Sequence, residues 1–387
     1  MPGYVGSMKW NWQQEAWPRF SYDPSALTSL EERFRVESAK LIGASSIISD
    51  SEREHFTIEL MSEEALQSSR IEGEVLDRDS VASSLLRQMG LDTEYSDHRA
   101  GARERGIAAL MADNYRAFET PLSHAMLHKW HRFIVGHDRL LRDVGCYRTG
   151  SDPMRIVSGH AGREQVHFEA PPAERQMAEM EAFVDWFNDT GPDGGQPLPA
   201  LTRAGIAHLW FESIHPFEDG NGRLGRAISE KALAQSLGKP GLFALSHYIE
   251  AHRPDYYRQL EAHQKRMQID RWLAWFGDAV LDACAHSQRL VRFIVEKTRL
   301  YDRVRSKLNE RQEKSLARMF AAGLPGFKGG MSARKYMKIT GATSKTATRD
   351  LQGLVESGAL IRTGKLKGTR YWLNLGKAFK GVTAPED

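Results

Sequence analysis

Apolar side chains recur every three to four residues along most of this chain, which is the spacing of helices with one buried face. The stretches with this spacing are residues 27–41, 50–69, 100–118, 122–135, 172–188, 202–214 and 253 to about 308. A chain of 387 residues is long enough for two or three domains and an extensive core. We therefore expect a mainly α-helical protein with more than one domain.

Two short segments interrupt the helical pattern. Residues 154–157 and 165–169 flank the turn-rich residues 158–162, and Val166 and Phe168 alternate with more polar neighbours. This arrangement predicts a β-hairpin inside an otherwise helical protein. Further along, the proline and glycines of residues 324–330 indicate a domain boundary.

Composition excludes several classes of protein. No apolar run approaches the roughly 18 residues that a transmembrane helix needs, and the first residues lack the pattern of a signal peptide. The two cysteines, Cys146 and Cys284, are too few for a disulfide framework or a four-thiolate zinc site. We therefore expect a cytoplasmic protein that does not associate with a membrane.

The net charge of +3 is unevenly distributed along the chain. Residues 331–380 contain 11 Lys and Arg against two acidic residues, whereas residues 1–330 carry a net charge of −4. Any attraction to nucleic acid must therefore come from the C-terminal segment.

Residues 215–226 carry the clearest chemical pattern, His-Pro-Phe-Glu-Asp-Gly-Asn-Gly-Arg-Leu-Gly-Arg. Residues 220–222 can turn successive backbone N–H groups inward around an anion, and the helix that follows adds the positive end of its dipole. Arg223 and Arg226 are three residues apart, so both can reach phosphate oxygens at that helix end. This stretch therefore predicts a phosphate-binding loop.

A base and a metal ligand accompany the predicted loop. With its unperturbed pKa of about 6.5, the His215 imidazole is mostly neutral at cellular pH and can accept a proton. The Asp219 carboxylate is a hard oxygen ligand suited to Mg²⁺, which proteins bind through one or two carboxylates together with substrate phosphates.

The stretch resembles the signature of the Fic family of nucleotidyl transferases, H-P-F-x-[D/E]-G-N-G-R-x-x-R. The resemblance implies a Fic-type helical bundle with a β-hairpin flap. It also implies transfer of AMP from ATP to a Ser, Thr or Tyr hydroxyl of a target protein, with UMP or phosphocholine left open as the transferred group. His215 would be the general base, Asp219 would hold Mg²⁺, and the two arginines would clamp the β- and γ-phosphates. The implied nucleotide site comprises Gly220, Asn221, Gly222, Arg223, Leu224, Gly225 and Arg226.

The resemblance extends to the hairpin and to a downstream segment. The hairpin stands where the family has a flap that holds the target peptide by strand addition. Tyr256 and Tyr257 resemble the segment that packs on adenine, with core packing as the alternative. Gln264 stands where several relatives have an Asn that reads the base. The flap residues implied to touch the nucleotide are Val157, Ser158, Gly159 and His160.

A second pattern precedes the expected catalytic core. Residues 68–73, Ser-Ser-Arg-Ile-Glu-Gly, match the family's inhibitory pattern [S/T]-x-x-x-E-[G/N], which begins here at Ser68. The match implies that Glu72 binds Arg226 and takes the cation that the γ-phosphate needs. In some relatives the same Glu removes AMP from the target, so a de-AMPylating or bifunctional enzyme stays open. A solvated carboxylate at a helix end is the alternative for Glu72.

Three histidines share one face of a predicted helix. His124, His128 and His131 have a spacing that can bind zinc, but no Cys or acidic partner accompanies them. We expect them to be core or surface histidines.

The basic C-terminal segment predicts two helices at residues 332–338 and 344–357, joined by a tight turn. Ser344 is the expected N-cap of the second helix, with Ala347, Leu351 and Leu354 facing inward. Residues 359–363 and 369–373 predict a hairpin with a basic tip. The segment resembles a winged helix-turn-helix domain, which binds DNA or docks onto proteins. The implied nucleic-acid contacts are Lys345, Thr346, Thr348, Arg349, Lys365 and Lys367.

The expected domains are an N-terminal helical region with the inhibitory motif (1–99), a Fic catalytic domain (100–308) and a winged helix-turn-helix domain (309–387). The expected function is a protein adenylyltransferase restrained by Glu72, whose C-terminal domain binds DNA or a protein partner. A transcription regulator with a nucleotide-sensing Fic core is the alternative from another class. Because relatives often dimerise, a homodimer stays open.

Overall fold

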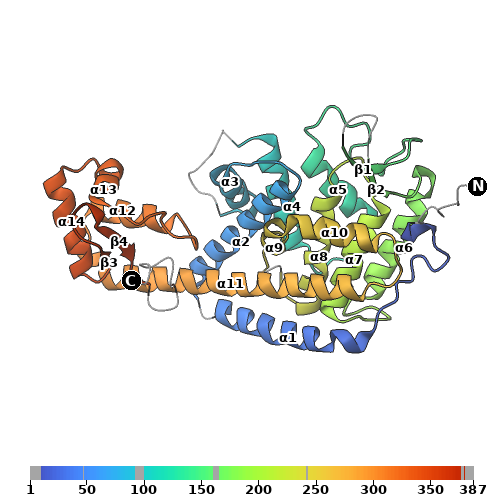
Figure 1. The fold of residues 1–387 in the computed structure, drawn as a ribbon, viewed down its shortest axis with the longest axis horizontal. Helices are drawn as coiled ribbons and strands as arrows, with labels where there is room; N and C mark the ends of the chain where they lie inside the picture. The colour runs from blue at the N-terminus through green and yellow to red at the C-terminus, as the bar shows by residue number, and fades with distance from the viewer. Residues whose placement is uncertain are drawn as a thin grey trace, which may run out of the picture. The chain divides into compact units, whose positions relative to one another are not determined.

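The computed structural model describes residues 10–46, 48–91, 100–159, 165–240, 243–375 and 379. These residues are mainly helical, with two small antiparallel strand pairs (Figure 1). This confirms the expected fold class at the level of a mainly α-helical protein. The chain forms two compact units: residues 1–42 with 57–287, and residues 43–56 with 288–387.

The first unit is a helical assembly with one hairpin. Its complete helices are α3 (Arg78–Met89), α4 (Ala102–Arg116), α5 (His124–Val135), α6 (Gln176–Asp189), α7 (Ala200–Ile214), α8 (Asn221–Leu237), α9 (Leu245–Ala251) and α10 (Arg253–His263). Three helices have residues in both units: α1 (Pro24–Ser46), α2 (Asp50–Ile71) and α11 (Asp270–Val304). Single 3-10 turns precede α1 and α6, at Asn11–Gln13 and Ala173–Arg175.

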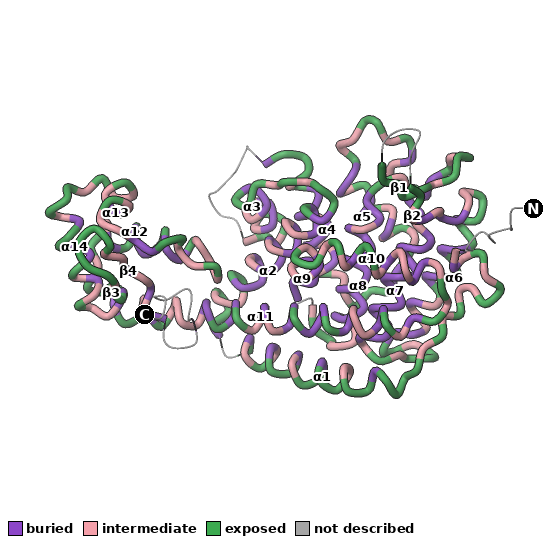
Figure 2. The backbone as a smooth tube through the Cα atoms, viewed as in Figure 1, coloured by how far each residue is buried: buried purple, intermediate pink, exposed green. Residues whose placement is uncertain are grey.

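Helix α7 lies at the centre of this unit. Every residue from Leu201 to Ile214 is buried, as the purple tube at α7 in Figure 2 shows. Its sequence is apolar around most of its circumference, as is typical of a helix surrounded by others. Buried helix α8 packs beside it, and the loop of residues 215–220 connects the two. The predicted phosphate loop is therefore held between two buried helices.

The predicted hairpin is present. Strands β1 (Arg155–Ser158) and β2 (Gln165–Glu169) pair in antiparallel fashion, with an irregularity between Ile156 and Val157. Phe168 is buried, and its ring meets the Trp10 ring edge to face at 5.3 Å. The hairpin is thus anchored through β2, whereas all four residues of β1 are exposed.

The second unit contains α12 (Glu310–Phe320), α13 (Ala333–Thr340), α14 (Ser344–Glu356) and the antiparallel strands β3 (Leu360–Thr363) and β4 (Arg370–Leu373). Short 3-10 turns lie at Arg305–Lys307 and Leu366–Gly368. Ala347, Leu351 and Leu354 are buried, as expected. The expected N-cap Ser344 is wrong: the extended residue before it, Thr343, accepts the hydrogen bond from Thr346 N.

A buried carboxylate ties the helices of the second unit together. Asp350 on α14 accepts hydrogen bonds from Arg311 Nε at 2.8 Å and Tyr336 Oη at 3.0 Å. Burial alone would raise the pKa of Asp350, but these donors outweigh it and lower the pKa below its usual value.

None of the helices in the described part of the chain has the length and the apolar character that a membrane span requires.

Candidate active site

His215 sits in a conformation that few non-glycine residues adopt. It caps the C-terminus of α7 with φ 50° and ψ 60°, a left-handed geometry that costs about 1–3 kcal/mol and that clusters at functional sites. Arg148 holds the backbone here: its Nε donates to the His215 carbonyl and its N–H donates to the Pro216 carbonyl, both at 2.9 Å. The strained residue is thus fixed from outside its own helix.

The His215 imidazole is neutral at pH 7. Its side chain is 13% exposed, and Nδ1 lies 3.9 Å from Glu212 Oε2. Burial lowers the pKa of His215 to about 4, and the charge of Arg148 adds to the effect. The ring is therefore ready to accept a proton across the whole neutral range.

The loop after His215 is closed by its own side chains and by α5. Asn221 accepts from Phe217 N at 3.0 Å and donates to Phe217 O at 2.9 Å, so its amide shapes the loop. Gly220 has φ 82°, which permits the turn into α8. His131 Nδ1 accepts from Gly145 N at 2.9 Å, which leaves Nε2 to donate to the Asp219 carbonyl at 3.1 Å.

The three histidines of α5 have separate contacts. His124 Nδ1 lies 2.6 Å from Tyr147 Oη, and the His128 ring packs edge to face on Tyr147 at 4.5 Å. His131 supports the loop of residues 215–220, and burial lowers the pKa of His131 to about 4. These contacts are those of core and loop-supporting side chains, in line with the expectation.

Arg226 is held by the end of α2. Its Nη2 donates to Glu72 Oε1 at 2.8 Å and to the Ser68 carbonyl at 2.9 Å, while its Nε donates to Ser68 Oγ at 2.9 Å. The guanidinium is 1% exposed. Burial alone would lower the pKa of Arg226, but the Glu72 carboxylate outweighs it and raises the pKa. Among the described residues, Nη1 of Arg226 has no hydrogen-bond partner.

Gly222 makes room for Glu72. A Cβ at this position would lie 2.2 Å from Glu72 Oε1. Any side chain at position 222 would therefore push the carboxylate away from the N-terminus of α8. The glycine that the phosphate-loop pattern requires is also needed for the contact with Glu72.

The second cation of the pattern is paired as well. Arg223 donates to Glu74 Oε2 at 2.8 Å and to Asp219 Oδ2 at 3.0 Å. Its side chain is 5% exposed, whereas that of Asp219 is 56% exposed. The carboxylates of Glu72 and Glu74 thus occupy both arginines that we expect to bind phosphates.

Glu212 is a buried acid next to His215. Burial raises its pKa to about 8, and the charge of Glu72 adds to the rise. This shift favours the protonated carboxyl near neutral pH. Gln264, which stands where several relatives have an Asn that reads the adenine, donates through Nε2 to the Glu212 carbonyl at 3.1 Å.

A cleft of about 760 Å³ is lined by several of these groups, although Asp219, Arg223 and Arg226 are not among its lining residues. Its lining includes Glu72, Glu212, His215, Gly222, Ile156, Val157, Ser158, His167, Phe168, Tyr256, Tyr257, Gln264 and the segment of α10 from Arg253 to Glu261. A cleft of this size fits a nucleotide-sized ligand. The structure thus brings the predicted base, inhibitory glutamate, flap and tyrosines to one cavity.

The two tyrosines differ. Tyr256 is 1% exposed, and its hydroxyl lies 2.8 Å from His208 Nε2, so most of the residue belongs to the core. Tyr257 is 41% exposed and donates to the Ile71 carbonyl at 3.1 Å, close to Glu72 in the chain. Tyr257 is the better placed of the two for contact with a ligand in the cleft.

The flap borders the cleft through β1. Val157 is 44% exposed, and Ser158 Oγ lies 2.6 Å from His167 Nε2. His167 Nδ1 in turn lies 3.0 Å from Glu261 Oε2 on α10, which fixes the hairpin to the cleft wall. Gly159 follows with φ 108°. His160 lies outside the described residues.

Sequence reasoning missed four residues of this site: Arg148, His167, Glu212 and Glu74. His167 lies within the predicted hairpin, but its contact with Glu261 was not predicted, and the other three residues lie outside the recognised patterns. Arg148 and His167 contact residues that are distant in the chain. Glu212 lies one helical turn before His215 and Glu74 two residues after Glu72, so proximity to each motif was the only available signal.

Two segments match known families. Residues 121–233 match the model of the Fic/DOC family, and residues 10–91 match the domain of unknown function DUF4172. The Fic match includes His215, Arg223 and Arg226, and the other match includes Glu72.

The curated relatives are adenylyltransferases by name. The chain is 28% identical over 172 residues to "Protein adenylyltransferase Fic" of Nematostella vectensis, covering 44% of this chain and 35% of that protein. It is 29% identical over 124 residues to "Protein adenylyltransferase fic-1" of Caenorhabditis elegans, covering 32% of this chain and 22% of that protein. The matches thus span about a third and a fifth of these relatives.

A solved structure has the same fold. The Fic family protein from Desulfovibrio desulfuricans G20 superposes with a TM-score of 0.53 and 22% identity, covering 92% of this chain and 98% of that one. At this identity the likeness concerns the fold. It supports the mainly helical, Fic-like architecture over nearly the whole chain.

Proposed function

We propose that this protein transfers AMP from ATP to a Ser, Thr or Tyr hydroxyl of a target protein, and that Glu72 restrains the reaction. The observation that carries the proposal is one cleft that holds a neutral His215 beside Glu72, whose carboxylate binds Arg226 at 2.8 Å. The names of the curated relatives support the reaction type.

The chain's own groups suit this reaction. Backbone N–H groups in the first turn of a helix lack acceptors within the helix, and the helix dipole favours negative charge there, so the start of α8 suits the phosphates. The target hydroxyl loses its proton to His215 as its oxygen bonds to the α-phosphorus. The bond from that phosphorus to the bridging oxygen breaks, and pyrophosphate leaves. General-base help of this kind contributes typically about 10²–10⁴-fold.

The site also suits Mg²⁺. Asp219 offers a carboxylate that is 56% exposed, and one carboxylate together with substrate phosphates is a usual Mg²⁺ ligand set. When bound, Mg²⁺ neutralises phosphate charge. Arg223, at 3.0 Å from Asp219, is the protein group that competes for this carboxylate.

Restraint follows from the arginine pairs. Arg226 already binds a carboxylate, and Arg223 binds Glu74. A γ-phosphate must displace the charge-assisted bond to Glu72 before it can use the Arg226 guanidinium fully. Nη1 of Arg226 has no hydrogen-bond partner among the residues that the structure describes, so the guanidinium can donate to a further acceptor.

The pH profile tests the role of His215. Because its pKa is lowered to about 4, the base stays neutral as the pH falls from 7.5 to 5.5. We expect the transfer rate of a Glu72→Gly variant to change by less than about twofold over this range. A histidine with an ordinary pKa of about 6.5 would lose about nine tenths of its neutral form. A rate that halves near pH 6.5 in single-turnover assays would contradict this account of the site.

We further propose that the second unit binds DNA as a winged helix. Lys345 and Arg349 are exposed and line a groove along α14 together with Thr348, while Thr346 is partly exposed. Lys365 and Lys367 are exposed between β3 and β4. A cationic helix face with a basic hairpin tip suits major-groove and phosphate contacts respectively.

Salt dependence tests this second proposal. DNA affinity of the full chain should fall as salt rises, because phosphate contacts release counterions. Changing Lys365 and Lys367 to Gln should reduce the slope of log K against log salt by about 2. The charge-matched pair Lys314→Gln and Arg318→Gln on α12 should leave the slope unchanged. The affinity is measured by fluorescence anisotropy titrations. An affinity that does not change with salt concentration, or no binding to any duplex, would exclude the DNA role.

A further inference from the structure

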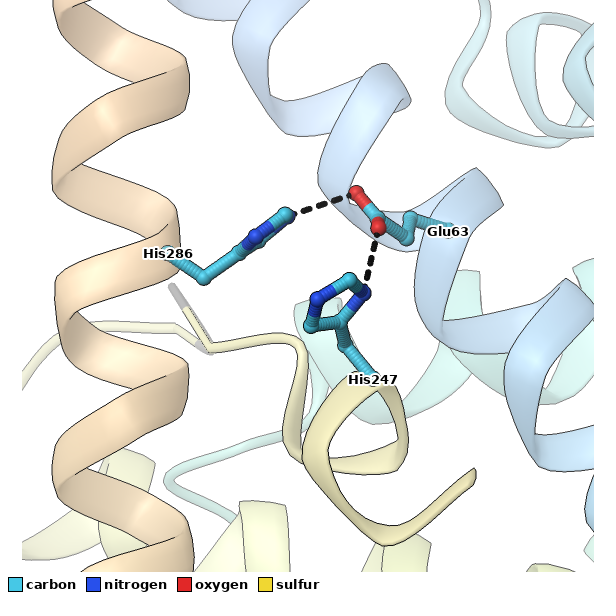
Figure 3. Close-up of side chains that lie close together, drawn as sticks. All are labelled: Glu63, His247 and His286. Atoms are coloured by element: carbon cyan, nitrogen blue, oxygen red, sulfur yellow. Dashed lines mark hydrogen bonds and ion pairs between the residues drawn. The ribbon is translucent and has the colours of Figure 1, made fainter. Parts of the chain in front are cut away.

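Glu63, His247 and His286 form a cluster that the cleft does not include. They come from α2, α9 and α11, and Figure 3 shows both imidazoles directed at the one carboxylate. His286 Nε2 lies 2.9 Å from Glu63 Oε2, and His247 Nδ1 lies 2.9 Å from Glu63 Oε1. Three helices separated by long stretches of sequence thus bring two nitrogens and a carboxylate together.

The spacing suits a metal ion. One potential ligand atom from each residue lies within 4.8 Å of the other two. Zinc sits about 2.0–2.2 Å from His nitrogens and carboxylate oxygens, which places adjacent ligand atoms about 3–3.5 Å apart. An ion can therefore bind with small side-chain movements, replacing the protons that the imidazoles share with Glu63.

The environment separates this cluster from an ordinary surface ion pair. The side chains of His286 and Glu63 are 6% and 16% exposed, and that of His247 is 34% exposed. The two imidazole rings stack with centroids 3.9 Å apart. The buried side supplies fixed ligands, and the exposed side at His247 admits water to the remaining coordination positions. Two His and one carboxylate with an open position is a common set for Zn²⁺ and related ions.

We propose that Glu63, His247 and His286 bind one divalent transition-metal ion, with Zn²⁺ as the best match to this ligand set. The ion would connect α2 to α9 and α11. Because α2 also carries Ser68 and ends at Ile71, directly before Glu72, bound metal would hold the helix from which both Arg226 contacts are presented. The metal site does not depend on the proposed AMP transfer.

Binding to the full chain tests the proposal. After removal of metals with a chelator, Zn²⁺ should bind at one ion per chain at pH 7.5, measured by calorimetry in the presence of a competing chelator. Bound Zn²⁺ should raise the Tm by a few degrees and slow hydrogen exchange in α2. His286→Gln and His247→Gln should each weaken binding by more than the 10–100-fold typical of losing an outer-shell partner.

Controls make the result decisive. His252→Gln removes an exposed histidine at the end of α9 and should leave Zn²⁺ affinity unchanged. Glu63→Gln keeps the size of the side chain and should also lose the ion, which guards against a histidine variant that fails to fold. Co²⁺ substitution in the unmodified chain should give the visible absorption of a four- or five-coordinate site. Affinity equal in all variants, or no such absorption, would overturn the proposal.

Discussion

Replacing Glu72 with glycine should increase AMP transfer about 10- to 100-fold. The carboxylate holds Nη2 of Arg226 at 2.8 Å, and its removal frees the guanidinium for the γ-phosphate. A hydrogen bond to a charged group contributes about 1.5–3 kcal/mol, and each 1.4 kcal/mol corresponds to a factor of ten. Initial rates with ATP, Mg²⁺ and a protein acceptor, including the enzyme itself, measure the change.

The control for this prediction lies on the helix that directly precedes Glu72. Glu54→Gly makes the same substitution at an exposed position of α2 and should leave transfer unchanged. An unchanged rate in Glu72→Gly would show that Glu72 does not restrain the reaction. If Glu72→Gly is inactive while the unmodified chain removes AMP from a modified protein, Glu72 is a catalytic residue and the enzyme is a de-AMPylating one.

Replacing His215 with alanine in the Glu72→Gly background should lower transfer by about 10²–10⁴-fold. We propose His215 as the base, and its neutral side chain interacts with the backbone of Glu212 in α7 rather than with the loop that follows it. The loop geometry depends instead on the Asn221 amide and on Arg148. We therefore expect the affinity for ATP, measured by calorimetry, to change by less than about threefold.

A lower transfer rate with an unchanged ATP affinity would identify His215 as the general base. His252→Ala, at an exposed histidine, should affect neither quantity. Transfer that stays within tenfold of the Glu72→Gly rate would place the base elsewhere. Loss of ATP affinity together with transfer would show instead that His215 maintains the site.

The sequence was most informative where the candidate functional residues lie close together in the chain. Residues 215–226 contain the base, the carboxylate, the glycines and both arginines, so one short stretch predicted most of the loop. Helix α7 was predicted from apolar residues spaced as on a helix with one buried face, whereas the structure buries it on all sides. Helix α3 was missed although Asp77 caps its start and Gly90 its end, because it is short and has few apolar residues.

Contacts between distant segments were harder to predict. The Glu72 contact to Arg226 spans 154 residues and was accessible only through a recognised pattern. Tyr256 was expected either at the adenine or in the core, and the contact between its hydroxyl and His208 is one that no local spacing reveals. The Glu63, His247 and His286 cluster has no sequence pattern because three separate helices build it.

The most direct test compares ATP labelled at the α-phosphate with ATP labelled at the γ-phosphate, using Glu72→Gly and the Glu72→Gly/His215→Ala double variant. We predict that protein acquires label from the α-phosphate and none from the γ-phosphate, and that the double variant abolishes it. Label arriving from the γ-phosphate would show a kinase-like reaction. No protein label from either nucleotide, with folded enzyme that binds ATP, would contradict AMP transfer as the activity of this site.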